Sequence, residues 1–277
     1  MMALGQDYVA LATAIANRTT QLSAVKGWCS LDPDLDHVPV TLFTDLNPTT
    51  LWREVNLLRV QSPKAVGASA LSIRHISELP PWAGPTGSAG LQEHLGSWRM
   101  RWYHAQTILA VPYRIVIYLD VDAIPCTSHG VTRLIEKVRQ RHASFGAPMV
   151  HESVKCGTSA GDCSSPHPEG LGDDELAEWA SFTERNSGVM VLDMLMAGPV
   201  VEDFARGIVR NAGNVSGDQF ALREALFMHR QDVRQVTFTD DEVCRYKSPW
   251  QAPCESDTST GCAVHHLPRM GSLKMIR

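Results

Sequence analysis

Several features that would assign a chain quickly to a class of protein are missing from this sequence of 277 residues. It has no apolar run of the roughly 20 residues that a membrane-spanning helix needs. It has no block of Lys and Arg of the kind that binds nucleic acid, and its net charge is −5. It has neither an internal repeat nor a break in composition that would mark a domain boundary. We therefore expect a single domain over residues 1–277, with no membrane span in this chain and no nucleic-acid partner.

The seven cysteines include no CxxC pair, which argues against a structural zinc site. Four of them fall in two loop-like stretches, Cys156 with Cys163 and Cys254 with Cys262. They are either surface thiols or two short-loop disulfides formed in an oxidising compartment. Residues 1–16 have no basic segment and are interrupted by Asp7, so they do not resemble a signal peptide. Both the Golgi or another secretory lumen and, as the alternative, the cytoplasm stay open.

What the chain does contain is ordinary globular composition, with 44% hydrophobic and 20% charged residues, and a regular alternation of segment types. Apolar runs typical of strands occur at 7–15, 38–46, 115–119, 144–154, 186–194 and 234–241, and helical patterns at 20–28, 91–110, 130–142, 198–211 and 217–227. A long loop is expected from Lys155 to Asp174. Strands that alternate with helices predict an α/β fold with a mainly parallel central sheet covered by helices on both faces.

The stretch "YRIVIYLDVDAIPC", residues 113–126, contains the clearest chemical signal. Its five apolar residues, Ile115–Leu119, predict a strand buried in the middle of the sheet, and Pro125 is expected to end the pairing. Asp120 and Asp122 follow the strand, at the edge where open α/β sheets keep their ligand crevices. Two carboxylates at this spacing can reach one point, and Mg²⁺ and Mn²⁺ prefer oxygen ligands. The alternative is that the pair only caps a turn or a helix.

Four stretches together resemble a known family: "YVALATA" at 8–14, "PYRIVIYLDVDAIP" at 112–125, "ERNSGVMVLDM" at 184–194 and "GDQFALREALF" at 217–227. In their order and spacing they are similar to the GT-A glycosyltransferases, most nearly to the retaining glycogenin/galactosyltransferase-like family eight. The resemblance implies a GT-A (Rossmann-like) fold. It also implies a nucleotide-sugar-binding half at 1–125 and an acceptor-binding half at 126–277.

The same resemblance implies a site for Mn²⁺ (or Mg²⁺) formed by Asp120 and Asp122, with His265 or His266 as a third ligand. It implies that a nucleotide diphosphosugar, foremost a UDP-sugar, contacts Ala12, Thr13, Asp45, Arg99, Arg101, Asp120, Val121, Asp122, Ser187, Gly188, Gly271 and Lys274. The resemblance further implies that Asn186, Asp218 and Gln219 take the catalytic roles beside the sugar.

The residues themselves leave simpler explanations open for several of these positions. Asn-Ser-Gly is also good turn chemistry ahead of a strand, and Asp218 suits a helix N-cap. Arg99 and Arg101 alternate with tryptophans, so they are either solvated charges over an aromatic face or donor contacts. The acidic cluster Asp173, Asp174 and Glu175 is assigned to the long loop, which we interpret as lying on the acceptor side.

The function expected from these signals is metal-dependent transfer of a sugar from a nucleotide diphosphosugar to an acceptor hydroxyl, with retention of configuration. The acceptor is a saccharide, a glycoconjugate or a protein. Two alternatives stay open. One is a phosphohydrolase whose first DxD aspartate is the nucleophile, although those enzymes usually carry that strand near the N-terminus. The other is a non-catalytic relative that binds nucleotide sugars.

Overall fold

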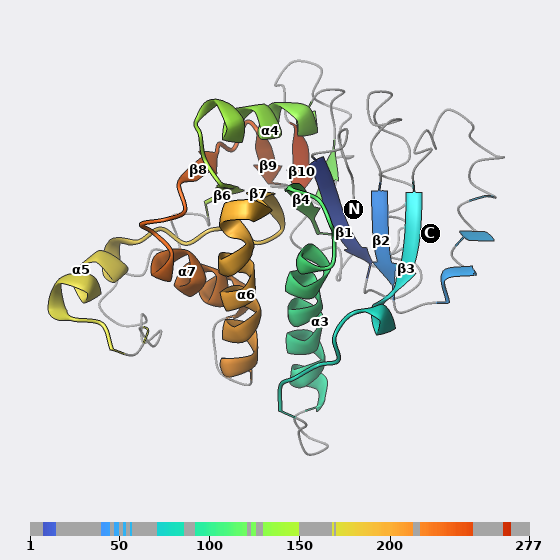
Figure 1. Cartoon of the computed structure of the whole chain (residues 1–277), viewed down its shortest axis with the longest axis horizontal. Helices are drawn as coiled ribbons and strands as arrows, with labels where there is room; N and C mark the ends of the chain where they lie inside the picture. The colour runs from blue at the N-terminus through green and yellow to red at the C-terminus, as the bar shows by residue number, and fades with distance from the viewer. Residues whose placement is uncertain are drawn as a thin grey trace.

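The structure is a computed structural model that describes residues 8–14, 40–44, 47–49, 52, 53, 56, 71–85, 92–120, 123–125, 130–149, 168, 170–212, 217–245 and 263–266. Its centre is a seven-stranded sheet with the order β3-β2-β1-β4-β7-β6-β8 (Figure 1). The strands are β1 Tyr8–Ala14, β2 Val40–Thr44, β3 Leu71–His75, β4 Ile115–Leu119, β6 Phe145–Pro148, β7 Val189–Asp193 and β8 Gln235–Phe238. The buried strand predicted at Ile115–Leu119 is confirmed, and all five of its residues are buried.

The direction of β7 distinguishes this sheet from a purely parallel one. β1 is parallel to β2 and β4, β2 to β3, and β6 to β8. β7 is antiparallel to both of its neighbours, β4 and β6. The predicted α/β fold with a mainly parallel sheet is confirmed. Because β7 is reversed, its first residue lies at the edge of the sheet where β4 ends.

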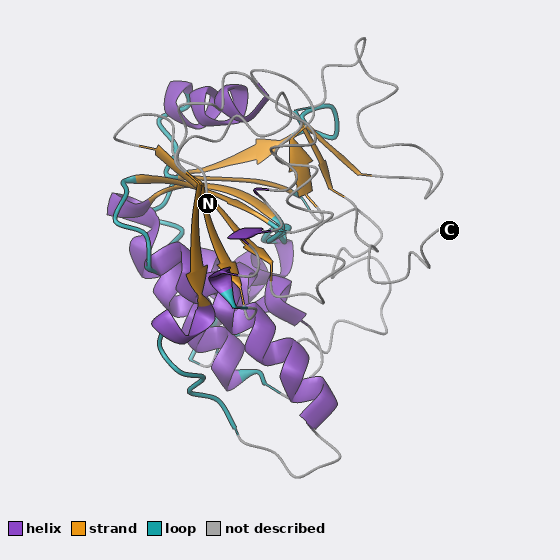
Figure 2. Ribbon diagram, turned by 90° about the vertical axis from the view of Figure 1, so that its right-hand side faces the viewer, coloured by secondary structure: helices purple, strands orange, loops and turns teal. Residues whose placement is uncertain are grey.

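The helices are α3 Gln92–Leu109, α4 Gly130–Gln140, α5 Asp173–Ser181, α6 Met194–Arg210 and α7 Gly217–Met228, with a short 3₁₀ helix, η4, at Ile76–Glu78. Figure 2 shows α4 above the strands and most of the helical mass below them, so helices cover both faces as predicted. Val131, Leu134, Ile135 and Val138 form the buried face of α4. Within the described residues, no helix is both long and apolar enough to span a bilayer.

One helix begins earlier than predicted, and one helix was not predicted. α6 begins at Met194 rather than near Gly198, because the Asp193 carboxylate accepts a hydrogen bond from the backbone N–H of Leu195 and caps the helix (3.2 Å). The acidic cluster Asp173, Asp174 and Glu175 is not in a loop but forms the first turn of α5. Negative side chains there are stabilised by the helix dipole, a signal that the loop assignment overlooked. The predicted helix at 20–28 lies outside the described residues.

A second, three-stranded sheet was not predicted. Its order is β5-β10-β9, formed by Ala123–Pro125, Val264–His266 and Val243–Arg245. Pro125 was expected to end the strand pairing. Instead it lies opposite Val264 in the antiparallel β5–β10 pair. β5 is an edge strand, which is where a sheet accommodates a proline. Three segments far apart in sequence therefore meet just after Asp120.

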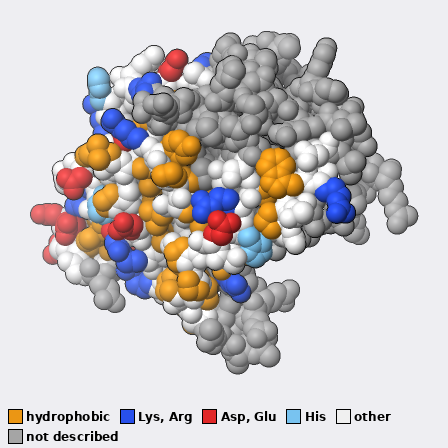
Figure 3. Space-filling view, turned by 45° about the vertical axis from the view of Figure 1, so that its right-hand side comes forward, with side chains coloured by type: hydrophobic (Ala, Val, Ile, Leu, Met, Phe, Trp, Pro, Cys, Tyr) orange, Lys and Arg blue, Asp and Glu red, His pale blue; other side chains and the backbone are white. Residues whose placement is uncertain are grey.

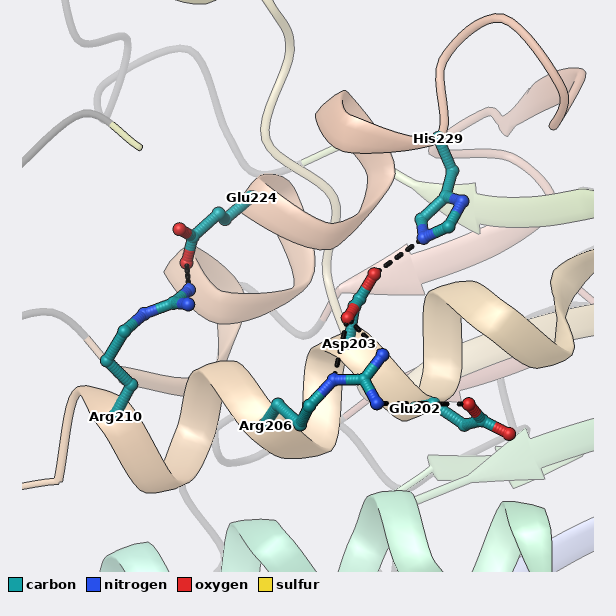
Figure 4. A network of polar contacts seen from close by, with 6 residues as sticks. All are labelled: Glu202, Asp203, Arg206, Arg210, Glu224 and His229. Carbon is teal, nitrogen blue, oxygen red and sulfur yellow. Dashed lines mark hydrogen bonds and ion pairs between the residues drawn. The ribbon is translucent and has the colours of Figure 1, made fainter. Parts of the chain in front are cut away.

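α6 and α7 pack closely against each other, and polar contacts join them (Figure 4). A Cβ on Gly207 would lie 3.2 Å from that of Ala221, so this crossing requires a glycine or some local adjustment. Asp203 contacts Arg206 at 2.5 Å and His229 Nε2 at 2.6 Å, and Arg210 pairs with Glu224. These contacts hold α7 in place relative to the sheet, and with it the residues of its first turn.

The contact between Asp203 and His229 gives a stability prediction. Burial alone would raise the pKa of Asp203, but hydrogen bonds from His229 and Arg206 hold it below its ordinary value. Such a carboxylate stabilises the fold above its ordinary pKa, and that contribution is lost as the pH falls through the folded-state pKa. We expect Asp203→Asn to lower the free energy of unfolding by about 1 kcal/mol at neutral pH and by clearly less near pH 3, measured by urea denaturation.

Glu202→Gln is the matched control, because Glu202 lies 4.0 Å from the same Arg206 and is 58% exposed. The surface in Figure 3 shows acidic and basic side chains mixed together, and exposed pairs of this kind contribute about 0–1 kcal/mol each. If Asp203→Asn lowered the free energy of unfolding equally at both pH values, the charge of Asp203 would not be the stabilising feature.

Candidate functional site

The strand order of the sheet reverses between β1 and β4. β2 and β3 follow one another on one side of β1, whereas β4 lies on the other side of β1. In an open α/β sheet this reversal is the topological switch point, where ligands bind beyond the C-terminal ends of the strands. Asp120 follows β4 directly, and the predicted donor-binding residues Ala12 and Thr13 lie in the second half of β1. The backbone therefore places these three residues on or directly after two neighbouring strands at the switch point.

The Asp120 carboxylate is held by a buried tyrosine. Tyr118 Oη donates a hydrogen bond to Asp120 Oδ1 (2.5 Å), and His104 Nδ1 of α3 lies 3.7 Å from the same oxygen. Tyr118 is fully buried, whereas the Asp120 side chain is 24% exposed. Tyr118 could have been recognised in the sequence, because residues two apart in a strand share a face. No local signal points to His104, which comes from another element.

The Asn-Ser-Gly segment forms a tight turn ahead of β7. Asn186 Oδ1 accepts a hydrogen bond from Gly188 N–H (2.9 Å), and Asn186 N–H donates to the Pro148 carbonyl (2.9 Å). The Gly188 carbonyl in turn accepts the backbone N–H of Asp120 (2.8 Å). The turn chemistry expected of this segment is confirmed, and the same turn joins Ser187 and Gly188 to the end of β4.

Asp218 is brought to this turn by the start of α7. Ser187 Oγ donates to Asp218 Oδ2 (2.6 Å), and Arg101 Nε lies 3.6 Å from Asp218 Oδ1. Asp218 lies within the first turn of α7 rather than at a cap position, and its side chain is 21% exposed. Gln219 follows it in the same turn and is half-buried. Ser187 and Arg101 therefore orient the Asp218 carboxylate, and the turn that carries Ser187 is the one that is bonded to Asp120.

The structure separates Arg99 from Arg101. Arg101 lies over the ring of Trp98, 5.0 Å from its centroid, and faces Asp218. Arg99 is exposed and lies near Tyr103, with Nη2 3.4 Å from the phenol oxygen. Residues two apart on a helix point to different sides. Only Arg101 of the two is brought to the residues at the end of β4.

The predicted metal site is described in part. The Asp120 carboxylate suits a hard divalent cation in chemistry and position. The backbone of His265 and His266 lies in β10, opposite Ile124 and Ala123. These two residues of β5 directly follow Asp122 in the sequence. The described residues contain no group of three or more His, Cys, Asp or Glu side chains that could hold a cation. Asp122, Val121, Asp45, Gly271 and Lys274 lie outside them, as do the side chains of both histidines.

Cys244 in β9 is disulfide-bonded, which the sequence analysis did not predict. The other six cysteines all lie outside the described residues, so its partner is one of those. The two predicted bridges, Cys156 with Cys163 and Cys254 with Cys262, also fall there.

A scan against protein-family models found no match for this chain, and a search of curated proteins found none. Solved structures are similar to it. The apo crystal structure of mouse xyloside xylosyltransferase 1 matches with a TM-score of 0.51 and 15% identity, over 94% of this chain and 97% of that one. The apo structure of the bifunctional glycosyltransferase WbbM matches with a TM-score of 0.55 and 11% identity, over 95% of this chain and 46% of that one. This chain therefore has the GT-A fold, as the resemblance implied.

Proposed function

We propose that this protein is a glycosyltransferase that moves a sugar from a nucleotide diphosphosugar, foremost a UDP-sugar, to a hydroxyl of a saccharide, glycoconjugate or protein acceptor. One observation carries the proposal. Asp120 lies at the switch point of a GT-A sheet, and the reversed strand β7 brings the Ser187–Asp218 pair beside it. The similarity in fold to a xylosyltransferase over nearly all of both chains supports it.

In this proposal Asp120 and Asp122 hold Mn²⁺ or Mg²⁺, and His265 or His266 completes the ligand set. The cation, when bound, contributes positive charge that stabilises the leaving diphosphate. The pairing of β10 with β5 supports the third ligand, because it holds the backbone of both histidines next to the segment that follows Asp122. Lys274 adds a second positive charge for the phosphates.

Asp218 is the residue that acts on the sugar. Its carboxylate, oriented by Ser187 and Arg101, stabilises positive charge on the ring as the bond from the anomeric carbon to the diphosphate oxygen breaks. The electron pair leaves with the diphosphate, and the acceptor oxygen bonds to the same carbon. If the configuration is retained, the acceptor enters on the face that the diphosphate leaves. Its proton then passes to the departing diphosphate oxygen, so no strong base from the protein is needed.

The disulfide at Cys244 supports a secretory lumen such as the Golgi as the working compartment, because disulfides persist mainly in oxidising compartments. Non-reducing peptide mapping of protein made in a secretory host, compared with protein made in a cytosol, tests this assignment. A free Cys244 thiol in the secreted protein would contradict it.

A screen of nucleotide diphosphosugars by thermal shift, with and without Mn²⁺, tests the proposed function. We expect one donor to stabilise the protein only when Mn²⁺ is present, and that donor then to support transfer to a simple glycoside. The anomeric configuration of the product, read by NMR, decides retention. Binding without turnover would favour the non-catalytic alternative, and phosphate release from phosphomonoesters would favour the phosphohydrolase.

Tyr118→Phe gives a narrower prediction about the cation. The change removes a single hydroxyl, the one that donates to Asp120, from a fully buried ring. Partners that orient a metal ligand typically contribute about 10- to 100-fold in affinity. We expect Mn²⁺ affinity, measured by calorimetry or electron paramagnetic resonance, to fall about tenfold. Tyr113→Phe, at a half-buried tyrosine two residues before β4, is the matched control, and equal affinity in both variants would contradict the role of Tyr118.

A further inference from the structure

Glu184 is a half-buried carboxyl that forms no hydrogen bond with any residue that the structure describes. It lies two residues before Asn186 in the segment that leads into β7. Among the described residues it makes no hydrogen bond and no ion pair. Half-buried carboxyls without a partner are uncommon in folded proteins, because burial of a charge is unfavourable unless the charge is compensated. Its position beside the site described above therefore needs an explanation.

The backbone around Glu184 determines which way its side chain points. Arg185 forms an isolated antiparallel bridge with Met149, and its guanidinium donates to Thr237 Oγ1 (2.5 Å) on β8. Neighbouring side chains in an extended segment point to opposite sides. Glu184 therefore points away from β8 and toward α7, in agreement with its two charged neighbours, Asp218 and Arg223, which both belong to α7.

Arg223 is the fixed positive charge next to Glu184. It is 3% exposed, its guanidinium lies 4.2 Å from the centroid of the Trp179 ring, and Nη2 donates to the Trp179 carbonyl (2.5 Å). Its Nε is buried without a hydrogen-bond partner among the described residues. An aromatic cluster of Trp179, Phe220 and Phe227 keeps this arginine in place.

The environment of Glu184 works against its ionised form. Burial is the largest cause and raises the pKa of Glu184 above its ordinary value; Arg223 opposes the change and Asp218 adds to it. A carboxyl kept in such surroundings lowers the stability of the protein once it ionises. Residues that are unfavourable for stability occur typically where a function requires them.

We propose that Glu184 belongs to the acceptor side of the site, where its carboxyl accepts a hydrogen bond from a hydroxyl of the acceptor saccharide beside Asp218. This inference rests on the proposed sugar transfer. Arg223 keeps the Glu184 carboxyl in place and supplies it with a compensating charge, while Ser187 and Arg101 hold Asp218 on the other side. The acceptor is then a sugar whose reacting or neighbouring hydroxyl lies between the two carboxyls. Asp218 acts on the donor sugar, and Glu184 selects the acceptor.

The test compares wild type, Glu184→Gln and Glu184→Ala in two assays with the same UDP-sugar and Mn²⁺. One assay measures hydrolysis of the donor by water, and the other measures transfer to a panel of methyl glycosides of common hexoses and pentoses. We expect the acceptor KM to rise about tenfold or more in both variants, the effect of losing a hydrogen bond to a charged group. We expect donor hydrolysis to stay unchanged.

A thermal melt separates this role from a structural one. Glu184→Gln resembles the neutral carboxyl, so the variant is expected to melt at least as high as wild type, with an advantage that grows as the pH rises through the pKa of Glu184. Glu202→Gln, at an exposed glutamate on α6, is the control and should change neither assay. An acceptor KM within twofold of wild type in both Glu184 variants would overturn the inference alone. The absence of both donor hydrolysis and transfer in wild type would overturn the proposed function instead, and this inference with it.

Discussion

Asp120→Ala is expected to weaken binding of the nucleotide diphosphosugar in Mn²⁺ by at least about 100-fold and to leave the fold intact. The Asp120 carboxylate lies at the end of β4, where the Tyr118 hydroxyl orients it. Without it the cation is held by fewer ligands, and the charge on the diphosphate is left uncompensated. Calorimetry with UDP or a UDP-sugar, with and without Mn²⁺, measures the effect.

Asp240→Ala is the matched control. Asp240 is exposed in the turn after β8, and its substitution removes one negative charge, as Asp120→Ala does. Circular dichroism of both variants shows whether the fold is kept. The residual binding of Asp120→Ala should equal that of wild type in EDTA, since both have lost the cation. If Asp120→Ala bound the nucleotide in Mn²⁺ with an affinity within a few-fold of wild type, the cation site would not lie at the end of β4.

Asp218→Asn is expected to lower kcat for sugar transfer by about 100- to 1,000-fold, the range found when one stabilising group is removed from a transition state. The change keeps the shape of the side chain and its ability to bond with Ser187 but removes the negative charge. Donor affinity should change by less than about threefold, because the charge matters mainly once the sugar becomes positive. Steady-state kinetics with the donor found in the screen separate the two parameters.

Ser187 tests whether the orientation of Asp218 matters as well as its charge. Ser187→Ala removes the 2.6 Å hydrogen bond and should lower kcat about tenfold, whereas Ser187→Thr keeps a hydroxyl and should recover most of that loss. Ser181→Ala is the control, at a serine whose hydroxyl caps the end of α5. If Asp218→Asn kept the kcat of wild type with saturating donor and acceptor, Asp218 would have no role in catalysis. This conclusion would hold for any result with the Ser187 variants.

Local pattern was sufficient for the elements closest to the site. The apolar run Ile115–Leu119 forms the buried strand β4, and the predicted helix from Gly217 forms α7. The strand depends on a property that neighbouring residues determine, because a continuous β-forming run must be buried on two faces. The sequence alone therefore determined an α/β fold and placed Asp120 at the end of a central strand.

The tertiary structure decided how these elements meet. Asp218 and Ser187 are 31 residues apart and touch only because β7 is reversed and α7 is held against α6. Arg99 and Arg101 have the same local setting, and only the position of α3 relative to α7 distinguishes them. The small sheet joins three short segments from different parts of the chain. The direction of pairing and helix packing depend on contacts between distant residues, and no local window of the sequence contains both partners.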